Sequence, residues 1–312
     1  MSMRIGLCMM VKNEAARIED CLKDIVDLFE QVVVFDTGSE DNTQEILRDR
    51  LDIEPIPARL NEARCQSFGD LRNQGIAKLE TPWVFCLDAD ERVERSQLQA
   101  LTQSKNLAEN DEISGYFCAW PTYHGDRVAY TDYKLPLFKR EIKRVGLVHD
   151  NVQLDIRVQK GRAVWQDNLI LRHYPEQQRK SQKSQFYLQR LFCATQQEPQ
   201  GYRYYWFIGY TYFHLGEYDK AVYYLSITAN SHAHQFPVEC LNSKMVLADI
   251  QARQGKQAEV KQTLLGAIAF YKTVADDFEV KINFRLKPWL NDALDKCSKG
   301  QLDHIKAYLF SY

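Results

Sequence analysis

Short, uninterrupted apolar runs alternate with amphipathic segments over the first hundred residues of the chain. Apolar runs of this length are typical of strands buried on both faces of a sheet. Apolar positions that repeat every three to four residues indicate helices with one buried face. The predicted strands are residues 4–11, 32–35, about 53–57 and 83–87, and the predicted helices are residues 14–29, about 43–50 and about 64–79. This alternation predicts an α/β domain with a mostly parallel sheet, covered by helices on both faces.

The pattern changes after about residue 113. Residues 113–174 are strand-like and mixed, and residues 175–190 are polar and rich in Gln and Lys. We interpret the polar segment as the connection into an all-helical tail. The predicted domains are therefore residues 1–175 and residues 176–312.

The tail contains a weak repeat. Gly216, Gly255 and Gly300 each follow an amphipathic segment and precede an apolar residue five positions later. Tetratricopeptide repeats have a period of about 34 residues, whereas these glycines are 39 and 45 residues apart. The copy around Gly216 is therefore the convincing one, and the other two are predicted to be degenerate helical hairpins.

Composition is that of an ordinary globular protein. The 312 residues carry 40 Lys and Arg against 42 Asp and Glu, so charge gives no reason to expect a nucleic-acid partner. No apolar run approaches the ~20 residues that a transmembrane helix needs, and we expect no transmembrane segment. The eight cysteines are scattered without zinc-binding spacing. They predict reduced core thiols and a cytoplasmic protein.

Polar residues follow three of the predicted strands. They are Lys12-Asn13-Glu14, Asp36-Thr37-Gly38-Ser39 and Asp88-Ala89-Asp90. Ligands of parallel sheets bind beyond the carboxyl ends of the strands. We therefore expect these three segments to line one binding site.

Each candidate residue also has a purely structural interpretation. Asp88 and Asp90 can face one divalent cation from an extended chain, or they form an acidic turn. Asp36 can accept hydrogen bonds from a nucleobase or a ribose, or it belongs to a turn before a helix cap. Arg72 can hold a diphosphate with two hydrogen bonds, or it lies on a solvated helix face.

Four segments, in order and spacing, resemble the motifs of family 2 glycosyltransferases with a GT-A fold. They are Met9–Glu14, Val33–Thr43, Leu71–Asn73 and Val84–Glu91. The chain from Leu171–Pro175 through Tyr212–Ala221 is similar to a bacterial subgroup that carries C-terminal tetratricopeptide-like helices. The resemblance covers nearly the whole chain and weakens after about residue 235.

The resemblance implies a role for each motif. It assigns Glu14, Asp36, Arg72 and Asp88 to the nucleotide sugar, with the backbone around Val11 against the base. It also makes Asp88 and Asp90 the motif that binds the diphosphate through a metal ion.

A further element, Gly146–Asp150, resembles the G-x-(I/V)-H-(E/D) segment of the subgroup. By this resemblance His149 is a metal ligand, with a hydrogen-bonded structural histidine as the alternative. Asp150 is the candidate general base, although the subgroup more often has Glu there. Glu91 and Asp126 compete with it for this role.

The implied activity is transfer of a hexose from a nucleoside-diphosphate sugar, with UDP as the expected nucleotide. Mn²⁺ or Mg²⁺ is the implied cofactor, a glycan or a peptide is the acceptor, and inversion is the family expectation. The helical domain can form a homo-oligomer or bind the acceptor. The rival hypothesis is an inactive glycosyltransferase-like scaffold. A sugar nucleotidyltransferase is disfavoured, because no glycine-rich loop follows the first strand.

Overall fold

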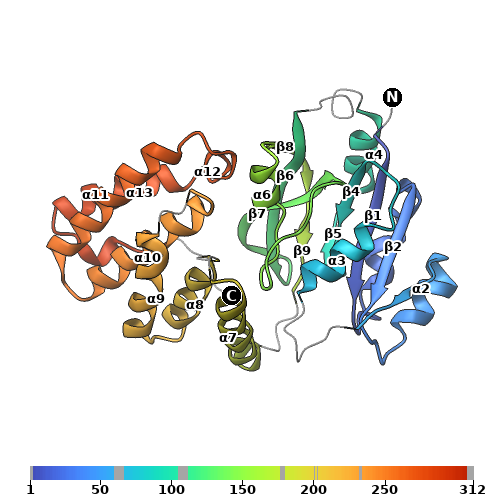
Figure 1. Cartoon of the computed structure of the whole chain (residues 1–312), viewed down its shortest axis with the longest axis horizontal. Coiled ribbons are helices and arrows are strands. Elements are labelled where there is room, and N and C mark those ends of the chain that lie inside the picture. The colour runs from blue at the N-terminus through green and yellow to red at the C-terminus, as the bar shows by residue number, and fades with distance from the viewer. Residues whose placement is uncertain are drawn as a thin grey trace. The chain divides into compact units, whose positions relative to one another are not determined.

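The computed structural model describes residues 3–59, 67–104, 112–175, 180–199, 201, 203–231 and 234–307. The chain divides into two compact units, Met1–Gln177 and Gln178–Tyr312 (Figure 1). Each unit has its own secondary-structure class. The first is a mixed α/β unit and the second is helical.

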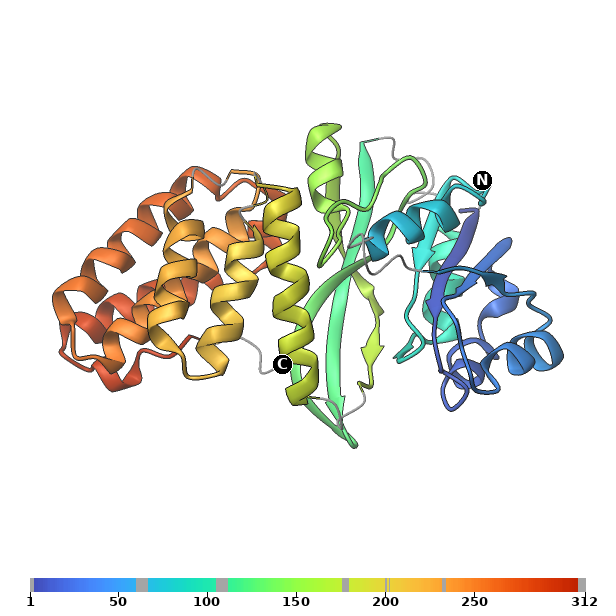
Figure 2. The ribbon, with the colours of Figure 1, turned by 60° about the horizontal axis from the view of Figure 1, so that its bottom comes forward.

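The first unit is built on one mixed sheet. Its strands are β1 (Ile5–Val11), β2 (Gln31–Asp36), β3 (Ile56–Pro57), β4 (Trp83–Cys86), β5 (Glu91–Arg92), β6 (Ile113–His124), β7 (Arg127–Lys139), β8 (Arg162–Ile170) and β9 (Arg172–His173). Their order is β3-β2-β1-β4-β7-β6-β9-β5, with β8 also paired to β6. The first four strands are mutually parallel, as the alternating pattern predicts. Strand β7 runs antiparallel to both of its neighbours, β4 and β6, and β6 and β7 run side by side as a long hairpin (Figure 2).

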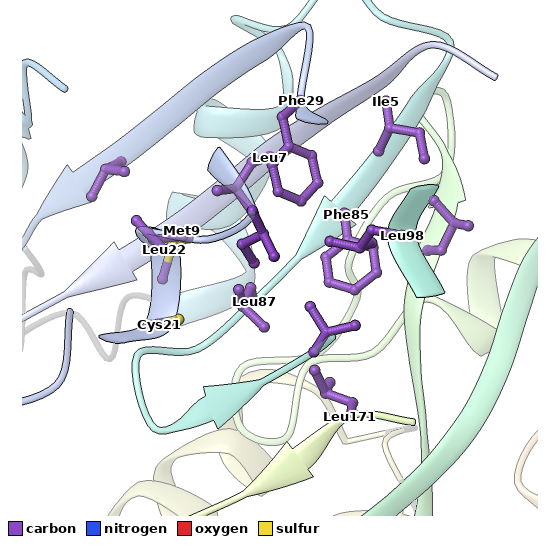
Figure 3. Close-up of a cluster of buried hydrophobic side chains, with 14 of the residues drawn as sticks. Ile5, Leu7, Met9, Cys21, Leu22, Phe29, Phe85, Leu87, Leu98 and Leu171 are labelled. Atoms are coloured by element: carbon purple, nitrogen blue, oxygen red, sulfur yellow. The ribbon is translucent and has the colours of Figure 1, made fainter. Parts of the chain in front are cut away.

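Five helices and a 3₁₀ turn accompany the described strands. They are α1 (Ile18–Leu22), η1 (Val26–Leu28), α2 (Thr43–Leu51), α3 (Phe68–Ile76), α4 (Arg95–Gln103) and α6 (Gln153–Val158). Alternate residues of β1 point to opposite faces of the sheet. Leu7 and Met9 enter the large apolar core that also contains Phe85 and Leu98 (Figure 3). Cys8 faces the other side, where its Sγ lies against Gly75 of α3. Helices therefore cover both faces, as predicted.

The helix predicted over residues 14–29 is wrong in extent. The structure has the short α1 and the 3₁₀ turn η1 in its place. The N–H groups of Glu14 and Ala15 donate to the side chains of Thr43 and Asp41, which holds this stretch as a turn against the loop after β2. The apolar periodicity nevertheless identified the buried side, because Ile18 is fully buried. The helix predicted over 64–79 is α3, and residues 64–66 lie outside the described residues.

The second unit is helical throughout its described residues. Its elements are α7 (Lys180–Gln197), α8 (Arg203–His214), α9 (Tyr218–Asn230), α10 (Pro237–Arg253), α11 (Gln257–Val274), α12 (Phe278–Ile282), α13 (Leu286–Ser298) and the 3₁₀ turn η4 (Leu302–His304). The expectation of a connection over 175–190 is wrong from Lys180 onward, where α7 begins. Lys, Gln, Arg and Leu are good helix formers, so a polar composition here does not indicate a loop.

The repeat in the tail corresponds to one recurring backbone motif. Gly216, Gly255 and Gly300 have φ of 77°, 71° and 72°, a conformation that favours glycine. At each, the N–H of the following residue bonds a carbonyl five positions back, as in the Schellman motif that ends helices. The apolar residues five positions later, Ala221, Val260 and Ile305, are buried. The second copy is the hairpin of α10 and α11, whereas the third joins α13 only to η4.

Two composition-based expectations can be compared with the structure. The free cysteines among the described residues, Cys8, Cys21, Cys86, Cys118, Cys240 and Cys297, are all buried. Cys193 is disulfide-bonded, so the prediction of reduced thiols is wrong at this residue. Cys65 lies outside the described residues. Over the part of the chain that the structure describes, no helix is long and apolar enough to cross a bilayer.

Candidate functional site

The carboxyl ends of β1, β2 and β4 converge as the sequence predicts. Val11 is in register with Asp36, and Cys8 with Cys86, two residues before Asp88. The carbonyl oxygen of Val11 accepts hydrogen bonds from the N–H and hydroxyl of Thr37, at 2.9 and 3.2 Å. These bonds hold the first two strand ends together, so the backbone around Val11 forms a fixed edge of the site.

Asp36 is a buried carboxylate at the end of β2. Its Oδ1 accepts the N–H groups of Gly38 and Ser39, at 2.8 and 2.7 Å. Its Oδ2 is buried and has no hydrogen-bond partner among the described residues. An unpaired buried acceptor costs free energy, so this oxygen is suited to a ligand that brings an N–H or O–H donor.

The loop after β1 is joined to the loop after β2. Asn13 adopts φ of 57°, and its Oδ1 accepts the N–H of Glu40 at 2.8 Å. The N–H of Glu14 donates to Thr43, and the Glu14 carboxylate forms an ion pair with Arg17 at 2.8 Å. The role of Glu14 toward a nucleotide sugar stays a prediction.

The first acidic residue after β4 lies between two cations. Arg72 donates to Asp88 Oδ1 at 3.0 Å, and Lys134 donates to Asp88 Oδ2 at 2.9 Å. Lys134 also contacts Glu91 Oε1 at 2.6 Å. Glu91 is fully buried and accepts the indole N–H of Trp120 at 2.7 Å. The structure thus brings together Arg72 and Asp88, both of which the resemblance assigns to the nucleotide sugar, and places Lys134 and Glu91 beside Asp88.

Asp150 continues the same network. Its Oδ1 accepts from Arg72 at 3.2 Å, and its Oδ2 accepts from Arg144. Helix α3 holds the loop that carries Asp150. The Asn73 amide exchanges two 2.9 Å hydrogen bonds with the backbone of Arg144, and Ser67 Oγ donates to the Gly146 carbonyl at 2.8 Å.

Charge pairing sets the protonation states in this network. Burial opposes ionisation of Asp88, but Lys134 and Arg72 outweigh it and hold the pKa of Asp88 below its ordinary value. Burial likewise opposes ionisation of Asp150, and Arg144 and Arg72 lower its pKa on balance. For Glu91 burial dominates and raises its pKa. Asp88 and Asp150 are therefore ionised at neutral pH.

The second acidic residue, Asp90, faces an imidazole. Strand β5 pairs with β9 so that Glu91 lies opposite His173, which brings His173 Nε2 to 3.5 Å from Asp90 Oδ2. The other ring nitrogen of His173 lies 3.0 Å from the buried hydroxyl of Thr122. The ring stacks on Trp120, with 4.5 Å between centroids. A histidine held in this way at one nitrogen presents the other to a cation.

His149 and Asp126 are the remaining candidate residues. His149 has φ of 53° beside Asp150, and its assignment as a metal ligand stays a prediction. Asp126 is exposed at the turn between β6 and β7. Among the described residues, no group of three or more His, Cys, Asp or Glu side chains is arranged to hold a metal ion.

Comparison with known proteins assigns the family. The family model described as glycosyl transferase family 2 matches residues 7–167, just over half of the chain. The chain belongs to glycosyl transferase family 2. It is a glycosyltransferase with a GT-A-like α/β domain, followed by a helix-rich region.

Similar proteins cover part of the chain. A TPR repeat-containing protein of Synechococcus elongatus is 32% identical over 113 residues, which are 36% of this chain and 26% of that protein. The lipopolysaccharide core biosynthesis glycosyltransferase LpsC of Rhizobium meliloti is 27% identical over 111 residues, which are 36% of this chain and 40% of LpsC. The chain thus matches between a quarter and two fifths of the length of these relatives.

Similar solved structures include the mannosyltransferase PcManGT of Pyrobaculum calidifontis in complex with GDP-Man and Mn²⁺. It is 15% identical with a TM-score of 0.44, over 96% of this chain and 88% of that one. S. aureus TarS (residues 1–349) in complex with UDP-GlcNAc is 14% identical with a TM-score of 0.43, over 96% of this chain and 90% of that one.

In this family 2 glycosyltransferase, sequence analysis missed several residues that complete the site. Lys134 and Arg144 come from the mixed segment after residue 113, where the apolar pattern indicates strands but not their register. Trp120 lies in the segment 113–174 that is predicted to be strand-like, and His173 lies in the motif Leu171–Pro175, but neither had an assigned role. The available signal for His173 was its position in that motif, Leu171–Pro175.

Proposed function

We propose that this glycosyltransferase transfers a hexose from a UDP-sugar to a hydroxyl of a glycan or peptide acceptor, with Mn²⁺ or Mg²⁺ as cofactor. The observation that carries the proposal is the buried, unpartnered Oδ2 of Asp36, which lies at the same edge of the sheet as the ion pair of Arg72 and Asp88. It combines an acceptor for a base or ribose with a cation for a diphosphate.

Because one oxygen of Asp36 already accepts backbone hydrogen bonds, its carboxylate favours uracil over guanine. Guanine presents two adjacent N–H donors, which suit both oxygens of one carboxylate. Here Oδ1 already accepts from Gly38 and Ser39, so one oxygen remains. Uracil presents a single N–H donor, at N3, which matches that single acceptor.

The charge balance of the network supports a metal ion. Three cations, Arg72, Lys134 and Arg144, are paired with the three carboxylates of Asp88, Glu91 and Asp150. A diphosphate therefore adds negative charge that no spare cation of this network offsets. Offsetting that charge, on binding and as the diphosphate leaves, is the chemistry that a divalent cation supplies.

Asp90 and His173 are the residues that fit such a cation. They offer one carboxylate oxygen and one imidazole nitrogen, with the ring oriented by Thr122. Mg²⁺ prefers oxygen ligands, so the imidazole favours Mn²⁺. The remaining ligands would be diphosphate oxygens and water.

Asp150 stays the proposed general base, and Arg72 determines when it acts. Both oxygens of Asp150 accept from guanidinium groups, which makes it a weak base. When Arg72 turns to the diphosphate, Asp150 keeps only Arg144, and its carboxylate gains basicity toward the acceptor hydroxyl. Glu91 is less suited, because its side chain is fully buried, whereas that of Asp150 is 8% exposed.

Calorimetric titration with UDP, with and without Mn²⁺, tests the proposal. We expect binding that needs Mn²⁺, weakens at least tenfold in Asp36→Asn and is lost in Asp90→Ala. Asp126→Asn, at the exposed hairpin turn, is the matched control and should bind as wild type does. Hydrolysis of UDP-sugars would then identify the hexose. Tighter binding of GDP would contradict the base assignment, and failure to bind any nucleotide would favour the scaffold hypothesis.

A further inference from the structure

Lys134 is a partly buried lysine at the centre of the carboxylate network. Its Nζ lies 2.9 Å from Asp88 Oδ2, 2.6 Å from Glu91 Oε1 and 5.6 Å from the centre of the Trp120 ring. Its side chain is 22% exposed, and that of Glu91 is 0% exposed. One ammonium group thus bridges two neighbouring carboxylates, and Arg72 is the second cation on Asp88.

Every carboxylate oxygen of Asp88 and Glu91 already accepts a hydrogen bond. Asp88 Oδ1 accepts from Arg72, and Asp88 Oδ2 accepts from Lys134. Glu91 Oε1 accepts from Lys134 and Trp120, and Glu91 Oε2 accepts the backbone N–H of Asp88 at 2.9 Å. A cation that binds either carboxylate must displace one of these donors.

Asp90 is in a different situation. Its Oδ2 faces His173 Nε2 at 3.5 Å, and its side chain is 29% exposed. Of the three acidic residues between 88 and 91, Asp90 is therefore the one whose carboxylate oxygens are not held by Arg72, Lys134 or Trp120.

We propose that Lys134 is a built-in counter-cation that keeps Asp88 and Glu91 out of the coordination sphere of the divalent ion. This proposal rests on the metal site proposed above at Asp90 and His173. The ammonium occupies the position between two carboxylates where a divalent cation would otherwise gain two charged ligands. It thereby limits the protein ligands of the ion to Asp90 and His173, and it leaves coordination positions for the donor diphosphate.

A purely structural role for Lys134 leads to a different expectation. If Lys134 only compensates the buried charge of Glu91, its removal lowers stability and leaves metal affinity unchanged. If it excludes the metal ion from Asp88 and Glu91, its removal creates a tighter site. Metal affinity without nucleotide distinguishes the two roles.

The experiment is a Mn²⁺ titration of the full chain without nucleotide, with free Mn²⁺ followed by electron paramagnetic resonance. Lys134→Met should bind Mn²⁺ at least tenfold more tightly than wild type. Lys139→Met removes a lysine from the same strand and is the charge control, expected to bind as wild type does. Adding Asp88→Asn to Lys134→Met should abolish the gain.

A second variant covers the case in which Lys134→Met does not fold. Glu91→Gln with Lys134→Met removes one charge of each sign, and it should still bind Mn²⁺ more tightly than wild type, through Asp88. Unchanged or weaker Mn²⁺ affinity in folded variants would overturn the proposal. The readout needs neither nucleotide nor turnover, so the two proposals can fail separately. If wild type binds no UDP but Lys134→Met gains Mn²⁺ affinity, the proposed function is refuted and the role of Lys134 is not.

Discussion

Replacing Asp150 with Asn tests whether the ion pairs of the site also stabilise the first unit. Asn keeps the size of the side chain and removes its charge. Asp150, Arg144 and Arg72 have side chains that are 8%, 12% and 19% exposed, so their charges are poorly hydrated. We expect Asp150→Asn to destabilise the first unit substantially, because Arg144 loses the carboxylate to which it donates.

The size of the effect follows from the geometry. Removing one partner of a buried ion pair costs about 3–5 kcal/mol, because an uncompensated charge remains. Arg72 retains Asp88 at 3.0 Å, which places the expected loss at the lower end, about 3 kcal/mol. That loss corresponds to a roughly 150-fold change in the unfolding equilibrium.

The assay must report on the first unit alone, since the chain has two units. Hydrogen exchange of the amides of β1 and β4 does so, because these paired central strands open only with the unit. Asp126→Asn is the control and should change the free energy of unfolding by less than about 0.5 kcal/mol. Arg144→Met with Asp150→Asn should cost at least ~1 kcal/mol less than the sum of the single changes.

The same variant has a defined pH dependence. Despite the opposing effect of burial, Arg144 and Arg72 hold the pKa of Asp150 below its ordinary value. Its stabilising contribution is therefore present above the unfolded-state pKa of about 3.9 and is lost as pH falls through the lower folded-state pKa. Wild type should lose this part of its stability below about pH 4, and Asp150→Asn should not. A stability loss under ~1 kcal/mol at neutral pH, or additive double-variant costs, would refute the reasoning.

Three further substitutions have defined outcomes. Gly69→Ala would place a Cβ 2.7 Å from the Cβ of Asp150. It should destabilise the first unit by about 1–3 kcal/mol in the hydrogen-exchange assay. No change would show that the loop carrying Asp150 moves away without cost. Gly266→Ala, in the open middle of α11, should instead stabilise the second unit by about 0.5–1 kcal/mol in thermal unfolding. Thr122→Val removes the partner of His173 and should weaken Mn²⁺ binding with UDP present by about 10–100-fold, whereas Thr122→Ser should bind normally.

The parts of the site that sequence could predict are those set by local pattern. An apolar run identifies a buried strand, and the polar residue that ends it marks the edge of the sheet, which located Asp36 and Asp88. Arg72 lies on a helix that leads directly into β4. These positions depend on short stretches of chain whose burial follows from composition.

The residues that sequence could not place depend on long-range register. Lys134 lies 46 residues from Asp88 along the chain. It reaches the site because β7 pairs with β4 through Val84 and Phe138, and because the β6–β7 pairing shifts register between Tyr116 and Cys118. A shift of one residue turns every side chain of a strand to the other face, and nothing in the local pattern of residues 127–139 determines that shift.

Helix α3 carries Arg72 and Asn73, which connect Asp88 with the loop of Asp150. Arg72 binds Asp88 on the donor side and Asp150 in the loop after β7, while Asn73 fixes that loop through the backbone of Arg144. A ligand that draws Arg72 toward itself therefore changes the environment of Asp150 without moving the loop. Arg72 can lie on Asp150 or on the ligand, and a ligand shifts the equilibrium between these two arrangements only by its own preference for one of them. Under the proposed function, a diphosphate has that preference, since it competes with Asp150 for the guanidinium, whereas an uncharged acceptor hydroxyl does not. The proposed function therefore implies donor binding before acceptor activation.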